Sequence, residues 1–358
     1  MRITPSILLA TVIAAAASGD VCRADDSVSP SGLLSSSAAA RRCCSQSPLL
    51  PGEGEGADFI ASDMSLGEFE DVWLHDENSS KAVEAVAVQF TSPRSYAAMP
   101  SECNSGGYSW HGMPQGLIYR PYLAGAKESR LRGVWNNEAN DGNIWDISLG
   151  GNVGLLRYGT RGDQRPEGIQ IGIEGAGLVR LDRDENQDVD AVDFRFGIPI
   201  TWGDAVSQWK FAYYHLSSHL GDEFLLKNPG YPRLNYSRDV LVLGHSRYLN
   251  PWWRAYGEVG YAVYTDVAEP WETQFGIEMA PPGRTGFRGA PFFAVNGHLR
   301  EEVDFGGNFV VQAGWGWRRS PATGLFRVGV EHYNGKDDQF SFYNESVQKT
   351  GFGIWYDF

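Results

Sequence analysis

Val347-Gln-Lys-Thr-Gly-Phe-Gly-Ile-Trp-Tyr-Asp-Phe358, at the end of the chain, alternates in character with a period of two residues. One face of a strand with this sequence carries Thr350, Phe352, Ile354, Tyr356 and Phe358. The other face carries Lys349, Gly351, Gly353 and Asp357, with Trp355 as an exception. An apolar outer face over a small or polar inner face is typical of a barrel strand in a membrane. The alternative is an edge strand of a soluble β-sandwich.

Similar segments follow one another from Gly116 onward and predict twelve strands. Their ranges are 129–137, 144–158, 168–181, 191–202, 208–218, 236–249, 252–265, 272–280, 291–303, 308–318, 325–333 and 348–358. Single-chain bacterial barrels have an even number of strands, and about 9–11 residues are enough for a tilted strand to span a bilayer. We therefore predict a monomeric, antiparallel transmembrane β-barrel of about twelve strands over residues 116–358.

Charged residues occupy the polar faces of these strands. In the segment 325–333, for example, Phe326 and Val328 alternate with Arg327 and Glu331. Charges that face lipid are unfavourable, so these faces should line the lumen. One such face carries Asn296, His298, Arg300 and Glu302. This ladder either lines the path of a small solute or forms a polar plug whose members bond to one another.

Composition narrows the classes of protein. Mean hydropathy is −0.32, which excludes a helical membrane protein but not a barrel, whose strands are polar at every second position. Aromatic residues make up 13% of the chain, with 12 Trp and 16 Tyr, as aromatic girdles at two membrane interfaces require. A net charge of −14 argues against nucleic acid as a partner. Outer-membrane lipids are the partner that the barrel interpretation predicts.

The N-terminal region, residues 1–115, lacks the alternating strand pattern of the rest of the chain. Arg2 and the short apolar run 7–17 predict a cleaved signal peptide over residues 1–24 and export to the outer membrane. Residues 25–115 form a low-complexity, poorly assigned segment that is rich in Ser, Ala and Gly at its start. Cys43, Cys44 and Cys103 lie in this segment, and the sequence does not fix which two would pair.

Three long motifs carry a family resemblance. They are Gly150-Gly-Asn-Val-Gly-Leu-Leu-Arg-Tyr-Gly-Thr160, Tyr213-Tyr-His-Leu-Ser-Ser-His-Leu-Gly-Asp-Glu223 and the stretch 294–307 that contains the ladder. From Gly116 to Phe358 the chain resembles a family of bacterial proteins known only as a domain of unknown function. The resemblance implies an outer-membrane barrel and supplies no activity. A final strand that ends in Phe also resembles the C-terminal signature of bacterial outer-membrane barrels.

The most suggestive catalytic candidates are His215 and Ser217, which share a face of one predicted strand with the apolar Phe211. A serine nucleophile needs a base and a group that orients the base. With Asn235 after the next turn, the arrangement resembles outer-membrane phospholipase A. His219 is an alternative base, with Asp222 or Asp239 as its orienting group. The competing interpretation is a polar strand end at the membrane rim.

A second candidate site is the acidic stretch 182–190, whose possible metal ligands are Asp182, Asp184, Asn186 and Asp188. Oxygen ligands at alternate positions resemble a calcium loop, so calcium is the cofactor that this stretch suggests. However, Gln187 stands where an EF-hand needs Gly, and a solvated hairpin turn is the competing interpretation.

Several functions remain open from the sequence. The first is an outer-membrane barrel with a structural or solute-conducting role. A lipid-cleaving hydrolase with its site on the lipid-facing wall is the second. The third is a soluble, secreted all-β binding module.

Overall fold

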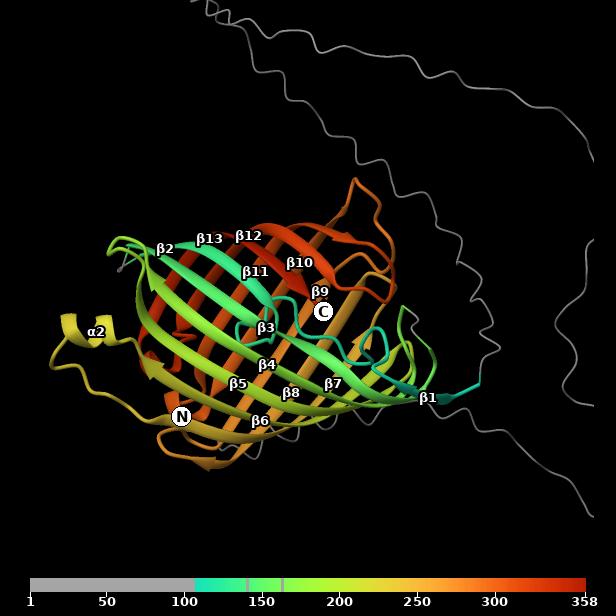
Figure 1. The fold of residues 1–358 in the computed structure, drawn as a ribbon, viewed down its shortest axis with the longest axis horizontal. Helices are drawn as coiled ribbons and strands as arrows, with labels where there is room; N and C mark the ends of the chain where they lie inside the picture. The colour runs from blue at the N-terminus through green and yellow to red at the C-terminus, as the bar shows by residue number, and fades with distance from the viewer. Residues whose placement is uncertain (1–106, 140–141, 162–163) are drawn as a thin grey trace, which may run out of the picture. The chain divides into compact units, whose positions relative to one another are not determined.

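The computed structural model describes residues 107–139, 142–161 and 164–358, which form a closed antiparallel β-barrel (Figure 1). Strands β2 to β13 each pair with the next, and β13 pairs with β2 to close the ring. Their bounds are β2 Leu131–Glu138, β3 Gly142–Gly159, β4 Gly168–Asp182, β5 Asp188–Gly203, β6 Ser207–Leu220, β7 Tyr236–Tyr248, β8 Trp253–Thr265, β9 Trp271–Met279, β10 Ala290–Arg300, β11 Gly306–Arg318, β12 Leu325–Lys336 and β13 Ser346–Asp357. The predicted twelve-stranded barrel is confirmed.

The closing strand β13 shows why alternation predicts the fold. Phe352 faces outward and is half exposed, whereas Lys349 faces inward and is fully buried. Trp355, the exception in the pattern, also lies inside the barrel, where its ring occupies the space that a side chain at Gly353 would need. The guanidinium of Arg327 lies 5.0 Å from the centre of that ring.

The barrel unit begins earlier than predicted. The short strand β1 (Ser109–Gly112) pairs with the last residues of β3, from Leu156 to Gly159. The predicted boundary at Gly116 is therefore too late, because four residues are too few for alternation to be visible in the sequence. The predicted signal peptide, the first part of the segment 25–115 and the three cysteines at 43, 44 and 103 lie outside the described residues.

Between β1 and β2 the chain runs through the interior of the barrel. We call residues 113–130 the plug segment. Its central residues Leu117, Ile118, Tyr119, Tyr122, Leu123 and Ala124 are all buried. Because this stretch contains apolar residues without strand periodicity, it fills the lumen instead of adding to the wall.

The two ends of the barrel differ. The described part of the helix rim consists of residue 139 and the connections 183–187, 221–235, 266–270, 301–305 and 337–345. It carries the helix α2 (Asp222–Lys227) and the 3-10 helices η1 (Glu301–Val303) and η2 (Phe340–Phe342). The terminal rim, where β13 ends, consists of the connections 160–167, 204–206, 249–252, 280–289 and 319–324. The connection 337–345 folds into the lumen, since Asp337 to Phe342 are buried.

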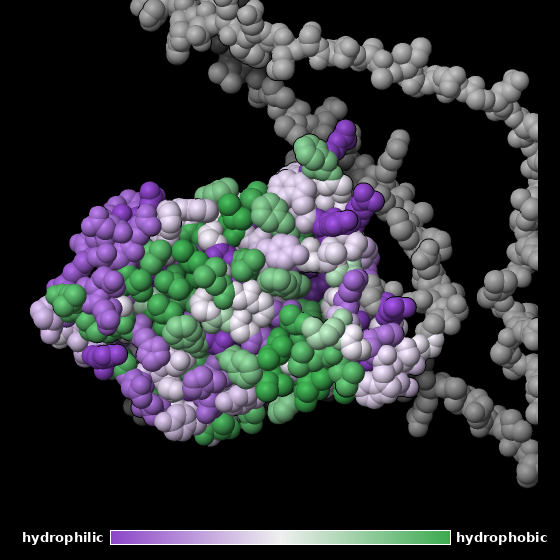
Figure 2. Space-filling model, viewed as in Figure 1, coloured by the Kyte–Doolittle hydropathy of each residue, from purple (hydrophilic) through white to green (hydrophobic). Residues whose placement is uncertain are grey.

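The outer wall is apolar. Figure 2 shows hydrophobic side chains gathered over the strands, while the end that carries α2 is largely hydrophilic. Exposed aromatic side chains stand near both ends of the strands, such as Trp135 and Trp271 toward the helix rim and Trp202 and Trp315 toward the terminal rim. Within the described residues, no helix is both long enough and apolar enough to cross a bilayer.

Candidate functional site

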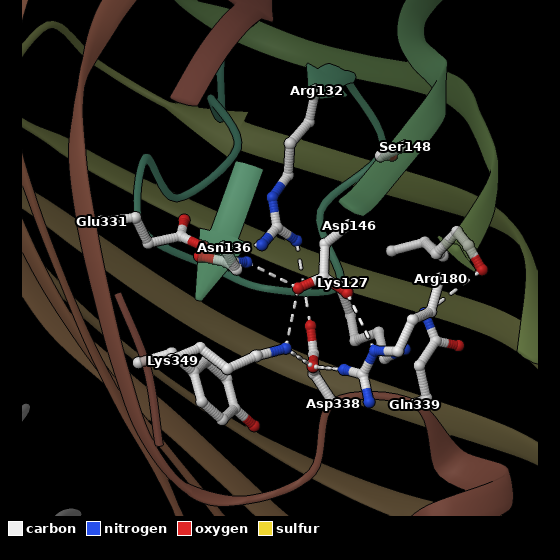
Figure 3. Close-up of polar contacts among 12 residues, drawn as sticks. Lys127, Arg132, Asn136, Asp146, Ser148, Arg180, Glu331, Asp338, Gln339 and Lys349 are labelled. Carbon is white, nitrogen blue, oxygen red and sulfur yellow. Dashed lines mark hydrogen bonds and ion pairs between the residues drawn. The ribbon is translucent and has the colours of Figure 1, made fainter. Parts of the chain in front are cut away.

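A cluster of buried charges fills the half of the lumen next to the helix rim (Figure 3). Its members are Lys127, Arg132, Asp146, Arg180, Asp193, Glu331, Asp337, Asp338 and Lys349. The Nζ atom of Lys349 donates to Asp146 Oδ2 at 2.9 Å and to Asp338 Oδ1 at 2.6 Å. The guanidinium of Arg180 also donates to Asp338, at 2.9 Å. Lys349 on β13 and Arg180 on β4 thus hold the connection 337–345 inside the barrel.

The plug segment is held by its backbone in the other half of the lumen. Arg254 on β8 donates to the carbonyl oxygens of Arg120 and Pro121, at 2.8 Å each. The carbonyl of Leu123 accepts from Arg327 on β12, at 3.1 Å. Guanidinium groups can satisfy carbonyls that no strand partner reaches, so an irregular chain can be buried here.

The predicted ladder on β10 points into the lumen, and each member has a partner there. Asn296 donates to the hydroxyl of Tyr256 at 2.9 Å. His298 Nε2 lies 3.1 Å from Glu272 Oε2. Arg300 donates to Glu302 at 2.7 Å, although Glu302 belongs to η1 and not to the strand. Of these contacts, the one between Arg300 and Glu302 joins two members of the ladder, and the other two reach the strands β8 and β9.

Strand β6 carries the two predicted catalytic residues on the outside of the barrel. Its inner face buries Ala212, Tyr214 and Leu216, so the intervening His215 and Ser217 face outward. The side chain of His215 is 42% exposed, and the residue lies in the part of the strand nearer the helix rim.

The partner that orients His215 is an aspartate. The β6–β7 register places Asp239 directly opposite His215, and Nδ1 of the imidazole lies 2.7 Å from Asp239 Oδ1. The hydroxyl of Tyr213 donates to the same oxygen, at 2.9 Å. A carboxylate at Nδ1 favours the tautomer whose Nε2 can accept a proton, which is how histidine serves as a general base.

Asn235 is not brought to His215. It precedes β7 at the helix rim and donates to Asp266 Oδ2 at 2.8 Å. His219, the alternative base, packs against Phe194, with ring centres 6.1 Å apart. The sequence analysis considered Asn235, Asp222 and Asp239 as groups that could orient a catalytic histidine. Asp239 is the one that contacts His215, whereas Asp222 is the first residue of the helix α2.

The acidic stretch forms the hairpin between β4 and β5, and its oxygens have protein partners. Asp182 Oδ1 accepts the backbone N–H of Asp184 at 2.8 Å. Asp184 itself accepts the backbone N–H of Asn143 at 2.9 Å, and this hydrogen bond lowers the pKa of the exposed Asp184 carboxyl. Lys227 on α2 pairs with Asp188 at 2.9 Å. Asn186 adopts a left-handed backbone, with φ of 60°.

No group of three or more His, Cys, Asp or Glu side chains in the described parts of the chain is placed to hold a metal ion. Calcium at Asp182, Asp184, Asn186 and Asp188 stays a prediction.

The sequence analysis missed the residues that fill the lumen. Asp337 and Asp338 look like a polar turn in the sequence, but both are buried in the charge cluster. The aromatic residues Phe340 and Phe342, three and five positions after Asp337, are the signal that could have indicated burial. The apolar run Leu117–Tyr119 is the corresponding signal for the plug segment.

Comparison with solved structures finds other barrels at low identity. Outer-membrane phospholipase A from Escherichia coli matches with 12% identity and a TM-score of 0.42, over 66% of this chain and 93% of that one. The dimer of the Salmonella typhi outer membrane phospholipase with bound calcium matches with 12% identity and a TM-score of 0.42, over 66% of this chain and 92% of that one. The KdgM porin matches with 9% identity and a TM-score of 0.38, over 64% of this chain and 99% of that one. We assign no role to this chain from them.

A search of curated proteins finds no match. A family model does match, over residues 103–358, and so covers β1 and the plug segment as well as the barrel strands. The family resemblance therefore begins at residue 103, earlier than Gly116, where the sequence motifs placed its start. The chain belongs to the family described as protein of unknown function (DUF1207).

Proposed function

We propose that this protein is an outer-membrane barrel whose lumen is kept closed, with a structural role and not that of a diffusion pore. The exposed apolar side chains of the wall, bordered by aromatic residues near both ends of the strands, support a membrane location. Such a wall in water would be an apolar patch far larger than soluble proteins expose. This argument also disfavours the soluble binding module.

Placing a charge on the wall tests the membrane location. Ile198 lies midway along β5 and faces outward. We expect Ile198→Arg to lower the free energy of unfolding in lipid vesicles by about 2–4 kcal/mol, because a cation at the bilayer midplane loses its hydration. Leu226→Arg, on the exposed helix α2, is the matched control and should change little. Equal stabilities of the two variants in urea titrations would contradict the membrane location.

The observation that carries the closed lumen is the burial of its charges. Among the largest fully buried side chains are six arginines, at positions 130, 157, 238, 254, 300 and 327. A water-filled pore would leave inward-facing guanidinium groups hydrated. Two cavities within the described barrel have volumes of about 40 and 10 Å³.

Planar-bilayer recordings test the closure. The full-length protein should insert without giving steady conductance steps. A variant in which residues 117–124 and 338–343 are both replaced by Gly-Ser sequences of equal length should conduct, because the lumen then loses the buried side chains of both internal segments. Conductance from this variant also serves as a positive control, because it shows that barrels inserted into the bilayer can be detected. Stable open steps from the wild type would overturn the proposal and return the ladder on β10 to a solute path.

A second candidate function, acyl-ester hydrolysis at the outer wall, is supported by the contact between His215 and Asp239. In this hypothesis Ser217 attacks a lipid ester carbonyl, His215 accepts the hydroxyl proton, and Asp239 holds the imidazole. The outward position gives the site access to acyl chains in the bilayer. Release of fatty acid from mixed micelles, with and without calcium, is the assay for it.

A further inference from the structure

A small cavity of about 40 Å³ lies inside the terminal rim. Its lining includes Arg120, Arg165, Tyr248, Arg254, Glu278 and Arg318. By the space that an ordered water needs, this volume holds about three waters. It therefore suits a small oxyanion and is too small for a sugar or a nucleotide.

Three of the four arginines around this cavity bond to backbone carbonyls and not to carboxylates, as far as the described residues show. The acceptors belong to Pro281 and Thr323 for Arg318, to Gln164 and Pro321 for Arg120, and to Ala205, Asn250 and Pro251 for Arg165. The guanidinium of Arg165 also lies 3.6 Å from the ring centre of Tyr248, which fixes its position. Carbonyls satisfy N–H donors but leave the positive charge without a counter-charge.

The two acidic side chains at the cavity are already engaged. Glu278 pairs with Arg254 at 2.7 Å. Asp357 pairs with Arg130 at 2.8 Å and with Arg327 at 2.7 Å. Because these carboxylates are bound to other cations, the side chains around the cavity keep an excess of positive charge.

The surroundings add to that excess. Within the described connections of the terminal rim, four further arginines (161, 284, 288 and 319) stand against two acids, Glu167 and Asp204. Burial, together with the positive charges of Arg120 and Arg254, lowers the pKa of Arg165. A bound anion would remove this mutual repulsion.

We propose that the cavity inside the terminal rim binds the phosphate oxyanion, either as free phosphate or as the phosphate of a lipid headgroup. Arg120, Arg165 and Arg318 supply planar forks of N–H donors, which match the geometry of phosphate oxygens. Arg254 adds charge while it remains paired with Glu278. Three of the lining residues, Arg120, Pro121 and Leu123, belong to the plug segment.

Phosphorus NMR titration of the full-length protein in a neutral detergent tests the site. The two probes are inorganic phosphate and dihexanoyl phosphatidic acid below its micelle concentration, each at an ionic strength held constant with chloride. Saturable line broadening with either probe is the expected result. A preference for phosphate identifies a solute anion as the ligand, and a preference for the lipid identifies a headgroup. No saturable broadening with either probe would overturn the proposal, whatever the behaviour of variants.

Arg165→Gln should weaken the binding of the preferred probe by about tenfold, because one charge-assisted fork is lost. Arg319→Gln is the matched control: Arg319 is exposed, follows Arg318 directly and does not line the cavity. It should leave the affinity unchanged. If both variants bind as the wild type does, the phosphate lies elsewhere on the rim and the proposal fails.

Discussion

A barrel carrying Ser217→Ala should release fatty acid from mixed micelles on the order of 10⁴-fold more slowly than the wild type. The expectation rests on the second candidate function. Removing the nucleophile leaves His215 and Asp239 with no attacking group to activate. The barrel itself should be unaffected, since Ser217 faces outward and is not part of the buried lumen. Heat-modifiable migration on a gel checks that the variant folds.

Three further variants locate the catalytic groups. Ser237→Ala is the matched control, because Ser237 lies opposite Ser217 on β7, and its rate should equal that of the wild type. Asp239→Asn should reduce the rate about as strongly as the loss of the serine, since the imidazole tautomer is no longer held. Asn235→Ala should retain the rate, because Asn235 contacts Asp266. Equal rates for wild type and Ser217→Ala would leave His215 as an interfacial residue.

The second large effect is expected in the lumen. Asp338→Ala should lower the free energy of unfolding by about 3–5 kcal/mol, because it removes the partner of buried cations. The side chains of Lys349, Arg180 and Asp338 are 0%, 5% and 4% exposed, so water cannot replace the lost carboxylate. Urea titration in lipid vesicles, followed by tryptophan fluorescence, measures the change.

A double-mutant cycle separates the interaction between Lys349 and Asp338 from non-specific destabilisation of the barrel. Lys349→Met together with Asp338→Ala should destabilise the barrel by clearly less than the sum of the two single changes, since neither charge is then left without the other. Asp184→Ala, on the exposed hairpin, is the surface control and should have a small effect. Additive changes would show that the two residues are not energetically coupled.

The strands could be predicted from the sequence because each wall residue has only two orientations. Phe352 and Lys349 must face opposite sides of β13, and one side is apolar. The lumen could not be predicted in the same way. Leu123 and Asp338 lie in irregular segments, whose path depends on which arginines reach their carbonyls or carboxylates across the barrel.

The candidate wall site was predicted in part, for a related reason. Alternation places His215 and Ser217 on the outer face, but it says nothing about the register of the neighbouring strand. The connection 221–235 contains α2, so its length does not fix the pairing as a tight turn would. Asp239 and not Asn235 therefore emerged as the partner of His215 only from the strand pairing.

The plug segment has a consequence for the order of assembly. It is enclosed by a ring that closes only when β13 pairs with β2, two strands far apart in the chain. Arg254 and Arg327 bond to its carbonyls from β8 and β12, so these strands need the segment in place to satisfy the N–H donors of their inward-facing guanidinium groups. Closing so long a loop is slow, and contacts nearer in sequence form first. We therefore expect the pairing of β2 with β13, the first and last barrel strands, to be the step that completes folding and encloses the segment.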